Sequence, residues 1–99
     1  MTETAYIYES LRTPRGKGKK DGSLYQATPI WLVRTLLKEM QQRHSLDTSL
    51  VDDVVLGCVT PVGEQGSDIA RIAVIDAGWA QSVAGVTLSR YCASGLESI

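Results

Sequence analysis

One cysteine of the sequence stands where its thiol could act as a nucleophile. Cys92 follows a stretch typical of a β-strand, Gly85 to Tyr91, and precedes small residues that open a helical pattern at Ala93. The unpaired N–H groups and the positive dipole end of such a helix favour a thiolate over a thiol. Gly95 leaves space for a substrate, and backbone N–H groups there could hold a developing oxyanion. Cys92 is therefore the candidate nucleophile, and burial as an ordinary core residue is the alternative.

The other side chains that could do chemistry are better explained by structure. His44 is the only histidine, and its position at the polar end of a helical pattern indicates an exposed imidazole. Cys58 lies in an apolar run and is expected to pack in the core. Two separate cysteines and one histidine form no ligand set, so no metal site is expected. Cys92 therefore has no partner base in this sequence.

Two glycine-containing stretches resemble ligand loops but miss the patterns that bind phosphates. Arg15-Gly16-Lys17-Gly18-Lys19-Lys20 lacks the glycine-lysine-Ser/Thr ending of a P-loop, and Gly63-Glu64-Gln65-Gly66 lacks the dinucleotide fingerprint. The first stretch is interpreted as a solvated loop, with contact to an anion as the alternative. The second is predicted to be a turn.

Composition limits the class of protein. The 99 residues, 43% of them hydrophobic, suffice for one small domain, and the net charge of −1 indicates neither a nucleic-acid nor a membrane partner. No apolar run approaches the roughly 18–20 residues of a transmembrane helix. The two isolated cysteines and a polar start without signal-peptide or transit-peptide features predict a cytoplasmic location.

The elements that must position Cys92 alternate between strands and helices. A hydroxyl cap followed by proline predicts a helix over residues 29–44, and Ser67 or Asp68 should cap a second helix that Gly78 terminates. Strands are predicted over residues 5–8, 54–59 and 85–91, and a third helix should begin at residue 93. This β-α-β-α-β-α order predicts an α/β domain with a mostly parallel sheet and helices on both faces.

Four motifs, in this order along the chain, resemble those of the N-terminal part of thiolases, the acetyl-CoA acetyltransferases and 3-ketoacyl-CoA thiolases. They are Arg12-Thr13-Pro14 after the first strand, Gly22-Ser23-Leu24 before the first helix, Val55-Leu56-Gly57-Cys58-Val59 with the glycine loop and Ile69-Ala70-Arg71 that follow it, and Ser89-Arg90-Tyr91-Cys92-Ala93-Ser94-Gly95-Leu96. The last is similar to the family's nucleophile motif, with Ser89 where asparagine is common and Tyr91 where phenylalanine or valine is common. The resemblance extends over essentially the whole sequence.

The resemblance implies a role for Cys92 and a reaction. Cys92 would take the acyl group of an acyl-CoA thioester, and its backbone N–H would contribute to an oxyanion hole. Acetyl-CoA would then attack the bound acyl group to form a 3-ketoacyl-CoA, and thiolysis by CoA is the reverse. The substrates are thus acetyl-CoA, acyl-CoA and CoA, with no resident cofactor. The histidine, the second cysteine and the asparagine–histidine pair that complete the family's chemistry are absent from this sequence.

The resemblance also implies that residues 1–99 are the first portion of a thiolase N-terminal domain, with an unfinished sheet. The rest of that half, the CoA-binding loop domain and the C-terminal half would lie outside them, so the isolated chain is expected to be inactive. The last predicted strand is similar to the edge strand at the family's dimer interface, which predicts a homodimer or homotetramer. The alternative to an enzyme is a non-catalytic α/β assembly module in which Cys92 is buried.

Overall fold

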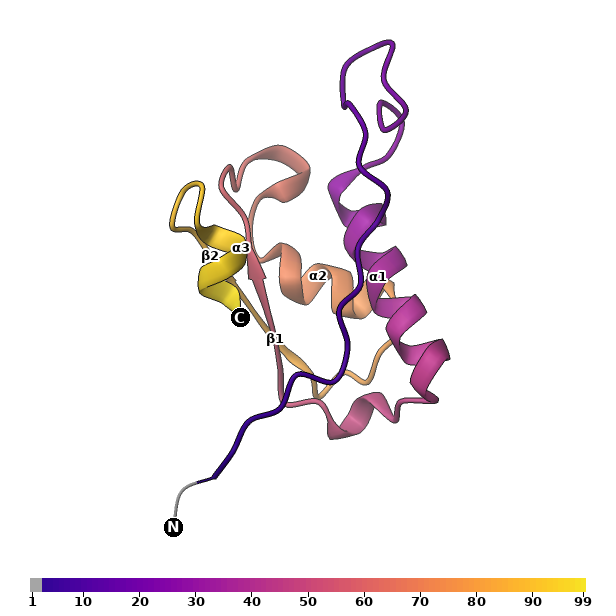
Figure 1. Ribbon diagram of the computed structural model, residues 1–99, viewed down its shortest axis with the longest axis vertical. Coiled ribbons are helices and arrows are strands. Elements are labelled where there is room, and N and C mark those ends of the chain that lie inside the picture. The colour runs from indigo at the N-terminus through magenta and orange to yellow at the C-terminus, as the bar shows by residue number, and fades with distance from the viewer. Residues whose placement is uncertain (1–2) are drawn as a thin grey trace.

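Two parallel strands form the centre of the structure, a computed structural model that describes residues 3–99 (Figure 1). The elements in chain order are α1 (Pro29–His44), the 3₁₀ turn η1 (Thr48–Leu50), β1 (Asp53–Gly57), the 3₁₀ turn η2 (Gly63–Gln65), α2 (Ile69–Asp76), β2 (Ala84–Leu88) and α3 (Ser94–Ser98). The α/β class predicted from the sequence is therefore confirmed. Among the described residues, no helix is long and apolar enough to cross a membrane.

Helices cover both faces of the sheet. β1 and β2 run parallel with Gly57 opposite Leu88, and successive side chains along each strand point to opposite faces. A Cβ placed on Gly85 would lie 2.5 Å from the backbone nitrogen of Arg71, so α2 lies directly against one face. A Cβ placed on Gly57 would lie 2.5 Å from the carbonyl carbon of Ser94, so α3 lies against the other. Glycine is thus required where each helix approaches the sheet.

The core lies between the sheet and the two longer helices. α1 packs on α2, and α2 packs on both strands. Ala70 and Ala73 are fully buried, and their small side chains let α2 lie close to the sheet. Burial of apolar surface is the main stabilising contribution in such a core. The connected buried cluster consists of Leu37, Ala73, Val74, Ala77, Trp79 and Val83.

Local capping signals explain the two longer helices. The Thr28 hydroxyl accepts a backbone N–H of the first turn at 3.1 Å, and Pro29 occupies the first helical position. Asp68 is the N-cap of α2, which decides between the two caps that the sequence allowed. Gly78, with φ of 74°, follows the last turn of α2 in the left-handed conformation. The predicted bounds of α1 and the predicted cap and terminator of α2 are confirmed.

The strand predicted over residues 5–8 does not form, and that prediction was wrong. Residues 3–18 have no regular secondary structure, and Glu9 in this segment contacts His44 at the end of α1. Tyr6, Ile7 and Tyr8 are 70%, 83% and 89% exposed, respectively. A strand requires a partner for its backbone groups, and in the described chain β1 pairs only with β2. The observed order is therefore α-β-α-β-α rather than β-α-β-α-β-α.

The predicted ends of the two strands were also too late. β1 ends at Gly57 rather than at residue 59, and β2 ends at Leu88 rather than at Tyr91. Tyr91 has a φ of 52°, in the left-handed region, which is incompatible with a strand. The chain therefore leaves the sheet before the cysteine and approaches it through a tight turn.

Candidate active site

Cys92 lies in the short turn that joins β2 to α3. The turn begins after Leu88 and ends where Ser94 starts the helix, and the Cys92 side chain is exposed. Because β1 and β2 are parallel, their carboxyl ends meet at one edge of the sheet, and this turn lies at that edge (Figure 1). Ligand sites of open α/β sheets are commonly found there. The exposed thiol differs from the buried one that a non-catalytic module requires.

Most backbone N–H groups of the turn are already paired. The N–H of Ala93 donates to the carbonyl of Arg90 at 3.1 Å, and the N–H of Ser94 donates to the carbonyl of Tyr91 at 3.1 Å. The N–H of Tyr91 donates to the hydroxyl of Ser89 at 3.3 Å. The N–H of Cys92 has no acceptor within residues 3–99. One donor beside the thiol is thus available to an incoming oxyanion.

The residue before the cysteine holds an uncommon backbone conformation. Tyr91 is one of three non-glycine residues with positive φ in the described chain, and its side chain is 80% exposed. A bulky residue pays a steric penalty in this conformation unless its surroundings impose it. The penalty and the tight hydrogen bonding mark the turn as a constrained corner. α3 has only five residues, so the corner, and not a helix dipole, is what distinguishes the position of Cys92.

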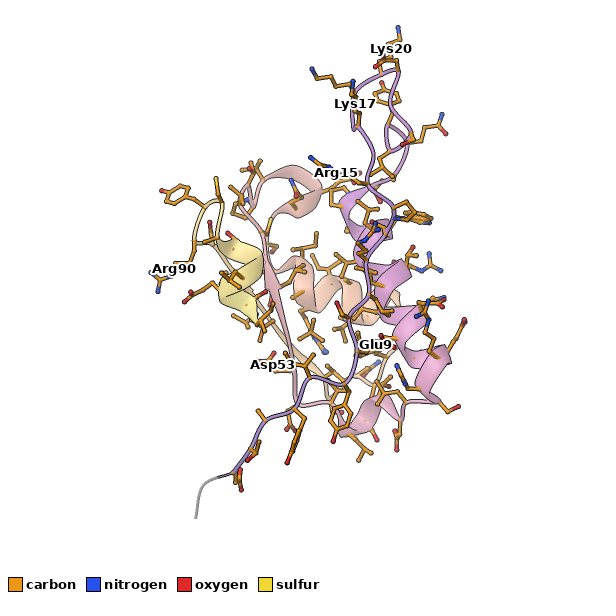
Figure 2. The ribbon with its side chains drawn as sticks, in the orientation of Figure 1. Glu9, Arg15, Lys17, Lys20, Asp53 and Arg90 are labelled. Carbon is orange, nitrogen blue, oxygen red and sulfur yellow. The ribbon has the colours of Figure 1, made fainter. Side chains whose placement is uncertain are left out.

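Arg90 of the turn forms an exposed ion pair with Glu97 of α3. Nε of Arg90 lies 3.4 Å from Oε1 of Glu97, and both side chains are largely exposed. Figure 2 shows Arg90 on the outer side of α3, away from the body of the molecule. Exposed pairs of this kind contribute about 0–1 kcal/mol and are screened by salt. The geometry of the turn is therefore better determined by its backbone and by Ser94 than by this pair.

Comparison with known proteins identifies the family. The family model described as the N-terminal domain of thiolase matches residues 5–99. The chain belongs to the thiolase family. It is 39% identical over 100 residues to the β-ketoadipyl-CoA thiolase of Pseudomonas aeruginosa, a match that covers 100% of this chain and 24% of that thiolase. It is 42% identical over 95 residues to the 3-ketoacyl-CoA thiolase of Bacillus subtilis, covering 96% of this chain and 24% of that one.

A solved thiolase structure agrees with the sequence matches. The acetyl-CoA acetyltransferase of Bacillus anthracis superposes with a TM-score of 0.67 at 35% sequence identity, over 77% of this chain and 19% of that one. The family resemblance and the α/β fold predicted from the sequence are both confirmed. The chain spans about a quarter of the length of the curated thiolases that it matches.

His44 does not lie in the turn that carries Cys92. It ends α1, and its Nε2 lies 2.9 Å from Oε2 of Glu9 in the N-terminal segment. The pKa of the Glu9 carboxyl is lowered, first by the N–H that it accepts from Ser10 and then by His44. Figure 2 shows Glu9 beside α1, across the sheet from Arg90 and the cysteine turn. His44 is exposed, as predicted, but it also tethers the N-terminal segment, which its position in the sequence did not reveal.

Cys58 is a core residue, as predicted. It is 7% exposed, and its Sγ lies 3.8 Å from Oε1 of Gln65, which η2 carries. Its backbone N–H donates to the carbonyl of Leu88 at 2.9 Å and extends the pairing of the two strands by one bond. Within residues 3–99, no three His, Cys, Asp or Glu side chains are arranged to hold a metal ion.

The basic stretch over residues 15–20 is an exposed loop, as predicted. It projects from the molecule beyond the start of α1, with Lys17 and Lys20 near its tip (Figure 2). The N–H of Leu24 donates to the carbonyl of Lys17 at 3.0 Å, and the N–H of Gly22 donates to that of Lys19 at 2.7 Å. The loop therefore has a closed base and a turn at its tip. Its contact with an anion stays a prediction.

Proposed function

We propose that residues 1–99 are the first portion of a longer thiolase and carry the nucleophile of an acyl-CoA:acetyl-CoA C-acyltransferase. Membership of the thiolase family supports the class of reaction. The single observation that supports the site is the constrained corner after β2, where an exposed Cys92 thiol stands beside its own unpaired N–H. In this proposal Cys92 is the catalytic residue, and the acid and base come from parts of the enzyme outside these residues.

In the first half-reaction, the Cys92 thiolate attacks the carbonyl carbon of an acyl-CoA. A sulfur–carbon bond forms, and the carbonyl oxygen becomes an oxyanion that accepts a hydrogen bond from the Cys92 N–H. The tetrahedral intermediate collapses when the bond to the sulfur of CoA breaks, and CoA leaves as a thiolate that takes up a proton. The acyl group remains on Cys92 as a thioester.

In the second half-reaction, a carbon–carbon bond forms. Removal of a methyl proton from acetyl-CoA by a base gives a carbanion, which attacks the acyl carbon held on Cys92. The bond between that carbon and the Cys92 sulfur then breaks, which releases a 3-ketoacyl-CoA and restores the thiolate. The reverse sequence, with CoA as the attacking thiol, cleaves a 3-ketoacyl-CoA. The substrates are acetyl-CoA, acyl-CoA and CoA, and no resident cofactor is needed.

The test is intact-mass spectrometry of the complete thiolase chain after incubation with acetyl-CoA. The mass should increase by one acetyl group, and digestion should locate the group on Cys92. A Cys92→Ala variant should gain nothing. A Cys58→Ala variant is the matched control, because Cys58 is buried in the core and should not affect acetylation of Cys92.

Three outcomes would contradict the proposal. An unchanged mass of the complete chain, or an acetyl group that persists in Cys92→Ala, would remove Cys92 from the reaction and favour the non-catalytic assembly module. The 99-residue chain assayed beside the complete enzyme should show no turnover, because it holds no base for the second half-reaction. Turnover by the short chain would therefore also contradict the assignment of roles.

We also propose that the functional form is a homodimer or homotetramer. Val55 and Val86, on the α3 face of the sheet, are 40% and 41% exposed, and Leu96 of α3 is 77% exposed. Exposed apolar side chains beside an open strand edge favour association with further protein. Light scattering on the complete chain should give a mass that is a multiple of the monomer, and a monomer at micromolar concentration would refute this part of the proposal.

A further inference from the structure

Ser94 is the buried polar residue of the cysteine turn. It is 3% exposed, whereas Tyr91 and Cys92 on the same turn are exposed. Ser94 is the first residue of α3 and lies against the end of β1, where Gly57 permits close approach of the two backbones. This contact accounts for the burial of Ser94. A buried hydroxyl requires hydrogen-bond partners, and the partners that Ser94 finds are groups of the turn itself.

The Ser94 hydroxyl joins two backbone groups that lie on either side of the left-handed residue. Its Oγ accepts the N–H of Arg90 at 2.9 Å and donates to the carbonyl oxygen of Tyr91 at 2.6 Å. The N–H of Ser94 donates to the same carbonyl at 3.1 Å. The Tyr91 ring is 80% exposed, so these bonds, and not packing of the ring, hold the uncommon backbone conformation.

The orientation of the Cys92 N–H follows from that hydrogen bond. The carbonyl of Tyr91 and the N–H of Cys92 belong to the same peptide group, and in a trans peptide these two groups point in opposite directions. A carbonyl held toward the buried Ser94 hydroxyl therefore aims the Cys92 N–H away from Ser94. That N–H has no acceptor within the described residues. The same peptide group leads directly to the Cα that carries the thiol.

We propose that Ser94 is a positioning residue for acyl transfer: its hydroxyl orients the Tyr91–Cys92 peptide so that the thiolate and the N–H of Cys92 meet the same thioester carbonyl. This rests on the role proposed for Cys92. Without the hydroxyl, the N–H of Arg90 loses its acceptor and Tyr91 can relax toward negative φ, which rotates the peptide that carries the donor. The thiol would remain exposed but would no longer be aligned with its oxyanion donor.

The experiment compares two reactions of Cys92 in the complete chain, acetylation by acetyl-CoA and alkylation by iodoacetamide. Alkylation needs only an accessible thiolate, whereas acetylation also needs the aligned N–H donor. In Ser94→Ala, acetylation should slow by about 10- to 100-fold, the effect of a misplacement of order 1 Å. Alkylation should stay within about twofold of wild type, because the thiol remains exposed. Ser94→Thr, which keeps the hydroxyl, should recover much of the acetylation rate.

The controls separate this proposal from the role of Cys92. Ser98→Ala removes another hydroxyl of α3, whose 2.7 Å bond to the Gly95 carbonyl lies outside the turn, and should acetylate as wild type does. If wild type acetylates Cys92 and Ser94→Ala does so at the same rate, the positioning role is refuted while the nucleophile stands. Equal slowing of both reactions also refutes it, because the hydroxyl would then act through the fold. If Ser94→Ala does not fold, Ser94→Cys replaces it, because the cysteine side chain is close to serine in size and its S–H is a weaker hydrogen-bond donor. A wild-type rate of Cys92 acetylation in Ser94→Cys would refute the positioning role of the Ser94 hydroxyl.

Discussion

Replacement of Gly57 by alanine tests whether the contact between β1 and α3 positions the cysteine turn. A Cβ at this residue would lie 2.5 Å from the carbonyl carbon of Ser94 and 2.8 Å from the nitrogen of Gly95, and both atoms belong to the backbone. Ordinary van der Waals contact begins at 3.4 Å, so the Cβ would lie about 0.9 Å too close to the carbonyl carbon of Ser94 (3.4 Å minus 2.5 Å). Because a backbone cannot rotate aside as a side chain can, the first turn of α3 has to move by about that amount.

The expected cost follows from this displacement. Overpacking by one methyl group costs about 1–3 kcal/mol. The lower entropy of the unfolded chain on replacing glycine offsets about 0.4–1 kcal/mol of that cost. Gly57→Ala should therefore destabilise the folded state by roughly 1–2 kcal/mol. Since α3 moves together with Ser94, acetylation of Cys92 should also slow by about 10-fold or more.

The assay measures the urea midpoint and the rate of Cys92 acetylation in the complete chain. Gly18→Ala is the matched control, because a Cβ there meets nothing within 4 Å and its φ is not in the left-handed range. The control should stay within about 0.5 kcal/mol of wild type and keep the wild-type rate. If Gly57→Ala shows the wild-type midpoint and rate, α3 is not held against β1 as described, and the reasoning about the turn fails.

Three further predictions concern the stability of the fold. Trp79→Phe should change the free energy of unfolding by less than about 1.5 kcal/mol, because the buried Nε1 has no hydrogen-bond partner in residues 3–99. Trp79→Ala, which leaves a cavity in the core, should cost about 3–5 kcal/mol, and chemical denaturation measures both variants. Thr87→Val should cost about 1–2 kcal/mol, because the Thr87 hydroxyl accepts the N–H of Ala70 at 3.3 Å and donates to Oδ1 of Asp68 at 2.7 Å. Thr87→Ser keeps the hydroxyl and should restore the urea midpoint, and an unrestored midpoint would refute the role of these bonds. The pKa of Glu9 is lowered in the folded chain, first by the N–H of Ser10 and then by His44, so its stabilisation is present above the usual value of 4.5 and is lost as pH falls through the lower folded value. Glu9→Gln should flatten this acid-side loss of stability, and identical pH profiles would contradict the lowered pKa.

Local sequence signals were sufficient for the two longer helices and for the family of the chain. Thr28 followed by Pro29 begins α1 for local reasons: the Thr28 hydroxyl accepts an N–H of the first turn, and the fixed φ of Pro29 already suits a helix. Asp68 and Gly78 set α2 in the same local way. The motif around Cys92 indicated the thiolase family, since a motif of residue types at fixed spacing can be recognised from the sequence alone.

Interactions between distant segments could not be read in this way. The segment over residues 5–8 has the composition of a strand, but a strand forms only where a partner edge is available, and within residues 3–99 the sheet consists of β1 and β2 alone. The requirement for glycine at residue 57 depends on a helix that begins 37 residues later, at Ser94. The hydrogen bonds on either side of the left-handed Tyr91 come from the same serine, which the fold buries. The sequence alone therefore predicted Cys92 as the nucleophile. Only the tertiary structure decided which groups surround Cys92, because that depends on how closely α3 packs on β1.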